Sequence, residues 1–387
     1  MEIEKLQTLS FEDEGVVGGT IAGLSCAHAL ITAGWGVVVL EKTSSPATGC
    51  ATGAGLGLDP LSQKLIKSWL DQPHMLDLTT LPLTIDQALP PGTVHWGQTF
   101  LSFRVSDDED CVKVKLKASQ SGEVTEVVGD LLVAADGCLS SIRQSFFPEL
   151  KLRGVLDFSN NEDSDTILGL KKAFPDLGKC LYFDLGSGTQ SVFYELLNKR
   201  INWIWYVNQP EPQLKGNSVT MKVSSDMIAK MHEAAEKVWL PELMKVIRET
   251  KDPFLNVIYD CEPLGQIFWQ KVVLIGDAAH ATTPQGLRST NMSILDAAVL
   301  GKCLEKWGVG NLASALQEYQ ATRLPVTTEQ VLFSQRLGRI KQGLQLPDRQ
   351  PLDPRTAWED CEELQQKKMP FLSDKPSILS HIKQLED

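Results

Sequence analysis

The stretch that most constrains the fold is residues 15–42, where two apolar runs bracket a segment of small residues. Residues 15–17 and 37–40 are rich in valine and predict buried strands, while the small residues between them suit a helix. This order predicts the β-α-β unit of a dinucleotide-binding fold.

Four positions of this unit have the chemistry that a dinucleotide needs. Gly18 allows a tight turn after the first strand, and Gly23 lets the helix pack closely against the sheet. The N–H groups at the start of the helix would face a pyrophosphate, although Thr20 replaces the middle glycine of the usual fingerprint. Glu41 ends the second strand, where a carboxylate can accept hydrogen bonds from a ribose.

A transmembrane helix is the rival interpretation of the same stretch, because no Lys, Arg, Asp or Glu occurs between Glu14 and Glu41. We reject it because glycines cluster at turn positions, His28 lies in the middle of the run, and the periodicity breaks near Gly34. No membrane span is therefore expected.

Composition limits the candidate binding partners and the expected cellular compartment. The 387 residues include 37 basic and 49 acidic side chains, and the net charge of −12 argues against nucleic acid and anionic membranes as partners. None of the eight cysteines forms a Cys-x-x-Cys pair, so we expect reduced thiols and no zinc site. The first residues are acidic and lack the features of a signal peptide, which predicts a cytoplasmic protein, with an organelle left open.

Two further strand-and-turn signatures follow. The buried strand 131–135 leads into Asp136-Gly137, with a helix capped near Ser140 that contains Arg143. The buried strand 271–275 leads into Gly276-Asp277, followed by His280, Pro284 and Gly286, and by a helix through Asn291.

The remaining segments predict a second sheet and several helices. Residues 60–70 predict a short helix, 93–135 a series of strands, and 225–250 one helix or two helices broken at Pro241. Aromatic strands occupy 180–208, and a helix over about 311–340 is expected to be interrupted near Pro325. The glycines of segment 48–57 either let the backbone approach a flat ligand closely or form a flexible loop. The sequence beyond about residue 342 predicts a loosely packed tail.

These three signatures, in this order and with Tyr319, Arg323 and Pro325 further on, resemble the single-component FAD-dependent monooxygenases. This is the flavin aromatic hydroxylase family, with zeaxanthin-epoxidase-like plant relatives, and the resemblance extends from residue 15 to about 340. It implies an α/β fold with a Rossmann-like FAD-binding domain (10–150 and 262–340), interleaved with a sheet-plus-helix substrate domain (151–261) and followed by a tail (341–387).

The resemblance also implies roles for individual residues. Glu41 and the glycines before it would hold the ADP half of FAD, and Asp277 the ribityl or pyrophosphate part. Pro284 would lie by the flavin ring near the site of oxygen reaction, and residues 286–291 would direct N–H groups to the ring's pyrimidine edge. Asp136-Gly137 with Arg143 would serve FAD and the transient NAD(P)H. The candidate cofactor-binding residues are Gly18, Gly19, Thr20, Gly23, Glu41, Lys42, Asp136, Gly137, Arg143, Gly276, Asp277, Gly286 and Asn291.

Several of these side chains have structural alternatives. Asp136 can cap its helix, and Arg143 can be a surface charge. His280 is interpreted as a structural hydrogen-bonding group rather than a base. Trp203 and Trp205 share one strand face, which could present indoles to an aromatic substrate, but core packing is favoured.

The chain departs from the family pattern in ways that keep alternatives open. A family helix with a phosphate-contacting arginine is missing between residues 82–87 and 88–92, and so is an aromatic strand before Arg153. Ala281 and Gln285 replace the residues that relatives often carry there. These gaps motivate a second hypothesis, a non-catalytic protein with weak or no FAD binding.

The function implied by the resemblance is an FAD-dependent monooxygenase. It would use NAD(P)H and dioxygen to hydroxylate or epoxidise a small aromatic or terpenoid-like substrate through a flavin hydroperoxide. A third hypothesis is an FAD-dependent reductase or dehydrogenase without oxygen insertion. The substrate, the choice between NADH and NADPH, and the oligomeric state are left open.

Overall fold

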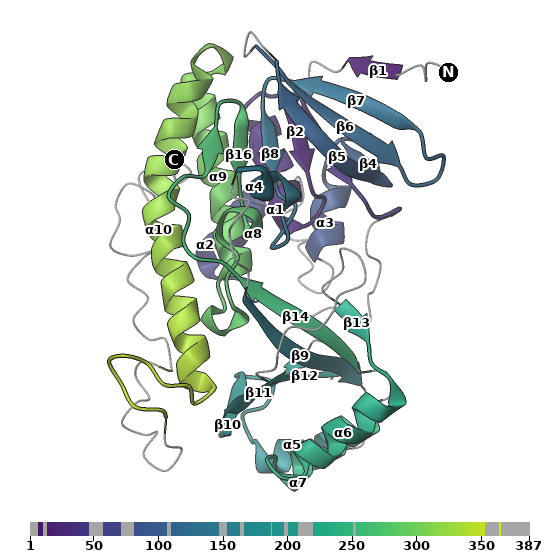
Figure 1. Cartoon of the computed structure of the whole chain (residues 1–387), viewed down its shortest axis with the longest axis vertical. Coiled ribbons are helices and arrows are strands. Elements are labelled where there is room, and N and C mark those ends of the chain that lie inside the picture. Colours follow the sequence, from purple (N-terminus) through teal and green to yellow (C-terminus); the bar gives the residue numbers. More distant parts are fainter. Residues whose placement is uncertain are drawn as a thin grey trace.

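The computed structural model describes residues 7–10, 14–45, 57–70, 81–106, 110–146, 153–162, 166–186, 188–196, 200–207, 220–250, 253–352 and 364. These residues form three sheets and the helices packed on them (Figure 1). The central part of the nucleotide-binding sheet is parallel, as the β-α-β pattern predicts. The predicted α/β class is confirmed.

The nucleotide-binding sheet contains strands from distant parts of the chain. Helix α1 (Ile21–Thr32) connects two of its neighbouring parallel strands, β2 and β3, over the stretch that predicted this unit. A single antiparallel strand, β15, forms one edge. In spatial order the described strands are β15 (Phe268–Trp269), β16 (Val272–Leu274), β8 (Leu132–Ala134), β2 (Glu14–Val17), β3 (Val37–Glu41) and β4 (Val94–Trp96).

Two long helices cover this sheet and share its hydrophobic core. Helix α9 (Ser289–Trp307) packs on α1, and α10 (Leu312–Lys341) packs on α9. The expected interruption near Pro325 was wrong, because α10 continues through the proline. An interior proline costs about 3 kcal/mol. Arg323 and Val326 on either side of it are fully buried, and their packing offsets that cost.

A small four-stranded sheet lies beside the nucleotide-binding sheet (Figure 1). Burial alternates along its strand β6, as the alternation of apolar and lysine residues at 112–117 predicted. Its edge strand β1 pairs with β7 in parallel and was not predicted. The strand order is β1 (Gln7–Ser10), β7 (Val124–Gly129), β6 (Val112–Ala118) and β5 (Gln98–Val105).

The third sheet is antiparallel and is formed entirely by residues 153–260. Strand β9 pairs with both β12 and β14 near the centre of this sheet, and the sequence did not predict it. The spatial order is β10 (Tyr182–Gly186), β11 (Thr189–Leu196), β12 (Arg200–Val207), β9 (Arg153–Glu162), β14 (Phe254–Asp260) and β13 (Thr220–Lys222).

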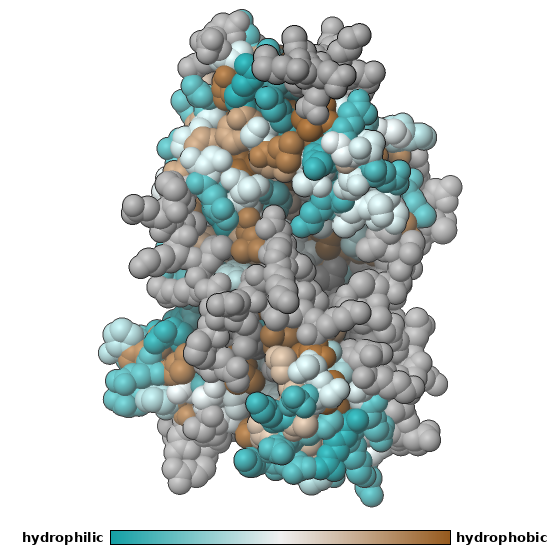
Figure 2. Space-filling model, turned by 45° about the vertical axis from the view of Figure 1, so that its right-hand side comes forward, coloured by the Kyte–Doolittle hydropathy of each residue, from teal (hydrophilic) through white to brown (hydrophobic). Residues whose placement is uncertain are grey.

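Three helices cover the outer face of the third sheet: α5 (Thr166–Ala173), α6 (Ser225–Ala235) and α7 (Pro241–Glu249). The predicted break at Pro241 is confirmed, since the proline is the first residue of α7. The surface of this lower end of the molecule is largely hydrophilic (Figure 2). Leu170 of α5, Met231 of α6 and Leu243 of α7 are buried in one hydrophobic cluster with residues of the sheet.

Trp203 and Trp205 belong to the core beneath these helices, so core packing is the correct interpretation of their shared face. Trp203 donates its indole N–H to the Thr250 hydroxyl at 2.9 Å, and Trp205 donates to the Thr189 hydroxyl at 2.6 Å. Both polar ends are satisfied inside the fold.

Two predictions fall largely outside the described residues. They concern the glycine-rich segment 48–57, of which Gly57 is described, and most of the tail beyond residue 352. Among the helices of the described ranges, none has the length and apolarity that a bilayer span requires.

Candidate functional site: a dinucleotide cleft

Two glycines at the turn between β2 and α1 have no room for a side chain. A Cβ at Gly23 would lie 1.8 Å from the carbonyl oxygen of Gly18, and one at Gly18 would lie 2.3 Å from that of Ala135. Gly18 also has a φ of +112°, a conformation that favours glycine. The first turn of α1 is therefore held directly against the strand ends, with its N–H groups open to a ligand.

Glu41 is fixed at the end of β3 by two backbone donors. Its carboxylate accepts hydrogen bonds from the N–H of Gly19 at 2.6 Å and from the N–H of Thr43 at 2.9 Å. The side chain is buried, and Trp96 of β4 is its register partner in the sheet. Each carboxylate oxygen keeps a second lone pair for a ribose hydroxyl.

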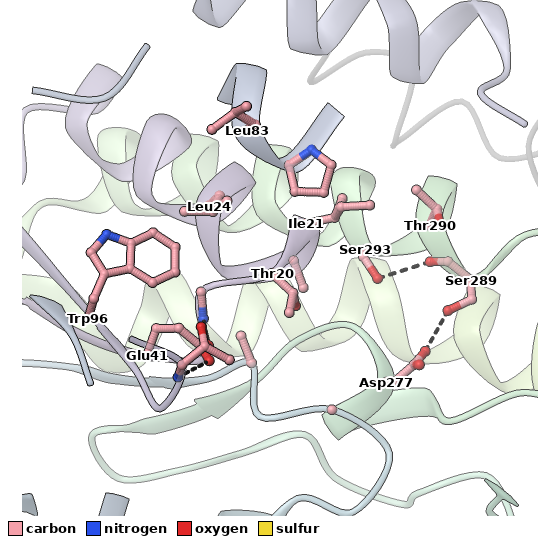
Figure 3. A pocket seen from close by; sticks show the side chains of 16 residues that line it. Thr20, Ile21, Leu24, Glu41, Leu83, Trp96, Asp277, Ser289, Thr290 and Ser293 are labelled. Carbon is pink, nitrogen blue, oxygen red and sulfur yellow. Dashed lines mark hydrogen bonds between the residues drawn. The ribbon is translucent and has the colours of Figure 1, made fainter. Parts of the chain in front are cut away.

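A cleft of about 330 Å³ runs from Glu41 and Trp96, past Thr20, to the start of α9 (Figure 3). Several residues singled out from the sequence line it together, although more than 200 positions separate the first from the last. They are Gly19, Thr20, Glu41, Gly137 and Asp277.

Asp277 lies at the opposite end of this cleft from Glu41 (Figure 3). It begins α8 (Asp277–His280), and its carboxylate accepts a hydrogen bond from the Ser289 hydroxyl at 2.5 Å. Ser293 donates to the Ser289 carbonyl at 2.9 Å. The first turn of α9 thus adds hydroxyl groups and the positive end of a helix dipole to the site.

Asp136 and Arg143 act on backbone groups beside the cleft. Asp136 caps α4 (Ser141–Phe146), since its carboxylate accepts from the N–H of Ser141 at 2.9 Å. Arg143 is buried, so the surface-charge alternative was wrong. It donates to the carbonyls of Asp277 at 3.0 Å and Ala278 at 2.9 Å, and to that of Cys138. Arg143 therefore holds the backbone that presents Asp277.

Gly276 and His280 meet a buried ion-pair cluster centred on Asp296. The Asp296 carboxylate accepts from the Gly276 N–H at 2.8 Å and from Arg323 Nε at 2.7 Å, and it lies 2.6 Å from His280 Nε2. Burial raises the pKa of Asp296, but the charges of His280 and Arg323 outweigh it and hold that pKa below its ordinary value. His280 thus has a structural partner, as interpreted from the sequence.

The loop before α9 packs against α10, and residues 284–288 are not among those that line this cleft. Pro284 begins the short turn η2 (Pro284–Gly286), and a Cβ at Gly286 would lie 2.0 Å from the Ser334 hydroxyl. Leu287 follows with a φ of +56°, a strained conformation for leucine. Gly286 is therefore required by its contact with α10.

Asn291 ties the start of α9 to the segment before α2 (Pro60–Trp69). Its amide donates to the Gly57 carbonyl and accepts from the Asp59 N–H, both at 3.0 Å. Arg288 forms an ion pair with Asp59 at 2.8 Å. Lys42 is exposed just beyond β3 and is not among the residues that line the cleft.

Sequence reasoning missed Trp96, Ser289 and Ser293. The two serines are four residues apart at the start of a predicted helix, and that spacing could have identified them. Trp96 could not be placed, because the pairing of β4 with β3 is a tertiary contact. The glycine turn, Glu41 and this cleft define a dinucleotide-binding class of protein.

Comparison with known proteins identifies the class more closely. A family profile described as an FAD binding domain matches residues 266–334. The FAD-dependent urate hydroxylase of Klebsiella pneumoniae is 24% identical over 367 residues, covering 85% of this chain and 90% of that protein. The aurachin C monooxygenase/isomerase of Stigmatella aurantiaca is 25% identical over 368 residues, covering 84% of this chain and 89% of that protein.

Solved structures share the fold. The 2,6-dihydroxypyridine-3-hydroxylase of Arthrobacter nicotinovorans superposes with a TM-score of 0.73 at 17% identity, covering 89% of this chain and 96% of that one. Klebsiella pneumoniae HpxO complexed with FAD and uric acid superposes with a TM-score of 0.70 at 19% identity, covering 97% and 98%. The chain is therefore related in sequence and fold to the FAD-dependent monooxygenases, which are oxidoreductases. The resemblance stated from the sequence is confirmed.

The residues present fit FAD. The glycine turn is shaped so that a Cβ would fill it, Glu41 offers a ribose acceptor, and two helix N-termini flank the path between Glu41 and Asp277.

Replacing Glu41 by alanine is expected to weaken FAD binding roughly tenfold or more, because a charge-assisted hydrogen bond contributes about 1.5–3 kcal/mol. Flavin fluorescence quenching on titration with FAD measures the change. Glu41→Gln keeps the size and the acceptor oxygen and is expected to lose less. Glu305→Gln, on the exposed side of α9, is the matched control. Equal affinities in the alanine variant and the wild type would remove Glu41 from the site.

Proposed function

We propose that this protein uses FAD, NAD(P)H and dioxygen to hydroxylate or epoxidise a small aromatic or terpenoid-like molecule. The observation that carries the proposal is the single cleft that joins the glycine turn and Glu41 at one end to Asp277 and the start of α9 at the other. The names of several relatives point the same way, among them 3-hydroxybenzoate 6-hydroxylase of Polaromonas naphthalenivorans.

The chain's own residues would bind and orient the cofactor. Glu41 would hold the ribose, and the N-termini of α1 and α9 would stabilise the phosphates. Arg143, through the carbonyls of Asp277 and Ala278, would fix the turn that carries the Asp277 carboxylate. FAD, when bound, would supply the redox chemistry with NAD(P)H and dioxygen.

The decisive experiment begins with the visible spectrum of the purified protein and the identity of any flavin released by heat. NAD(P)H oxidation and oxygen consumption are then measured with phenolic, indolic and terpenoid compounds. Oxygen uptake matched by an oxygenated product supports the proposal. NAD(P)H oxidation without such a product supports a reductase or dehydrogenase instead.

A non-catalytic protein is the second candidate, because the alignment with the urate hydroxylase of Klebsiella pneumoniae opens gaps in this chain. The 367 aligned positions with the urate hydroxylase use 85% of 387 residues, so the alignment contains gaps in this chain. Inserting a family-length segment after Gln87 should then raise FAD occupancy. Unchanged occupancy after the insertion would count against this candidate.

Asp277→Ala is expected to lower FAD affinity roughly tenfold to a hundredfold. The substitution removes a carboxylate from the cleft, and a hydrogen bond to a charged group contributes about 1.5–3 kcal/mol. Equilibrium dialysis with FAD measures the dissociation constant. Ser289→Ala tests whether the carboxylate or its hydroxyl partner matters, because it removes only the 2.5 Å contact. If Asp277→Ala binds FAD as the wild type does, Asp277 has no direct part in binding.

A further inference from the structure

The third sheet has a second face, opposite the tryptophans, that turns toward the nucleotide-binding sheet. Val192, Ile204 and Tyr206 form a small apolar cluster there, and Phe183 packs against it. The other face is covered by α5, α6 and α7 (Figure 1). Lys341 at the end of α10 reaches this second face through Phe183, and Gly343 just beyond α10 lies against Gly188. The turn η2 contacts Lys341 through the Gln285 carbonyl.

Two buried amides on this face lack hydrogen-bond partners within the described part of the chain. Gln190 is fully buried, and neither its amide oxygen nor its amide nitrogen has a partner there. Asn202 is 1% exposed, and its Nδ2 has none. Gln190 pairs with Tyr206 and Asn202 with Tyr194, so both amides project from the face that carries the cluster. Buried polar groups without partners require an explanation, and a bound ligand is one.

A buried cation lies beside the same face. Lys341, in the last turn of α10, is 1% exposed. Its ammonium lies 3.6 Å from the centroid of the Phe183 ring and 3.5 Å from the Gln285 carbonyl oxygen. No carboxylate within the described ranges forms an ion pair with it. Burial lowers the pKa of Lys341 to about 7, which reflects the cost of an uncompensated charge at this place.

The register of the sheet places Phe183, whose ring Lys341 covers, beside Gln190. Leu185 pairs directly with Gln190, and Phe183 pairs with Val192, so Phe183 and Gln190 are diagonal neighbours on one face. Such diagonal neighbours lie about 7–8 Å apart. Lys341 lies over the Phe183 ring, and the Gln190 amide projects from the same face of the sheet. Together they offer a lysine amine that an anion would keep protonated, a neutral amide donor and an aromatic ring.

We propose that Lys341 and Gln190 form a subsite for the anionic oxygen group of an aromatic substrate, either a carboxylate or an ionised ring hydroxyl. The anion would supply the counter-charge that Lys341 lacks and the partner that the Gln190 amide lacks. The link between this subsite and the reacting end of a flavin rests on the proposed function, whereas the preference for an anion does not.

Benzoate and benzamide are suitable probes, because they share one shape and differ in charge. Calorimetric titration of the purified protein, with its flavin content recorded, is expected to show benzoate binding roughly tenfold or more tighter than benzamide. Lys341→Met is expected to remove that preference, and Lys341→Arg to retain most of it. Lys302→Met, on α9 and paired with Glu305, is the control that should leave both affinities unchanged.

The outcomes separate this subsite from the proposed function. Equal binding of the two probes by the wild type, or no binding of either, overturns the subsite without any variant. A benzoate preference that survives in a folded Lys341→Met or Lys341→Gln protein also overturns the subsite. Such a result would mean that Lys341 has a structural role and does not contact the anion. If the preference depends on Lys341 but no NAD(P)H oxidation is found with any substrate, the subsite stands and the proposed function fails.

Discussion

Asp296→Asn is expected to destabilise the fold by about 3–5 kcal/mol, the cost of removing one partner from a buried ion pair. Asp296 and Arg323 are both fully buried, and the carboxylate also receives the Gly276 N–H and contacts His280. An asparagine keeps the shape but leaves the Arg323 charge without compensation. A shift of the urea unfolding midpoint measures the loss.

The Asp296 carboxylate also makes the stability of the fold depend on pH, with stability lost toward acid. Because the folded protein holds the pKa of Asp296 below the ordinary carboxyl value, its contribution to stability is present at neutral pH. That contribution is lost as pH falls through the lowered pKa of the folded state. The wild type should therefore lose more stability on acidification than the Asp296→Asn protein.

Two further variants make the result specific. Asp296→Asn combined with Arg323→Met removes both charges and should recover part of the lost stability. Glu305→Gln breaks an exposed pair with Lys302 and is expected to cost less than about 1 kcal/mol. If Asp296→Asn costs no more than Glu305→Gln, the cluster does not hold α9, α10 and the Gly276 turn together.

Gly23→Ala is expected to abolish tight FAD binding, with an affinity loss of roughly a hundredfold or more, since about 2.7 kcal/mol corresponds to that factor. The added Cβ would lie 1.8 Å from the Gly18 carbonyl oxygen and 3.3 Å from a methyl group of Val16. These atoms belong to the turn that presents the N–H groups of α1, so the helix must move away from the strand. The dissociation constant for FAD, with circular dichroism to check folding, measures the effect.

Gly169→Ala is the matched control for this substitution. Gly169 lies inside α5, and a Cβ there would meet nothing within 4 Å. Alanine in a helix interior favours the folded state by up to about 1 kcal/mol relative to glycine. If the Gly23 and Gly169 variants bind FAD equally well, the close contact at Gly23 is not required by the cofactor site.

The elements that could be predicted from the sequence are those encoded in local periodicity. The unit from β2 to β3 combines valine runs with glycines at fixed offsets, and Pro241 marks the start of α7 by its own chemistry. Strand β9 could not be predicted in this way. Its residues 157–162 are mostly polar, and its place in the sheet depends on pairing with β12 and β14.

The same distinction applies to the site. Glu41 could be identified by its offset from the glycine turn, because both lie in one local unit. The burial of Arg143 against the Asp277 turn could not, since 134 residues separate donor and acceptor. Lys341 gave no signal at all, because a lysine at the end of a helix normally lies in solvent.

The length of α10 has a mechanical consequence for the two larger sheets. Its 30 residues form a rod of about 45 Å that begins beside the nucleotide-binding core and ends at Lys341 against the third sheet (Figure 1). A helix that contacts both sheets would couple a rotation of one to a rotation of the other. Pro325 is the interior position of α10 that donates no hydrogen bond to the helix ladder. Any hinge motion that opens or closes the space between these sheets is therefore expected to bend α10 at that proline.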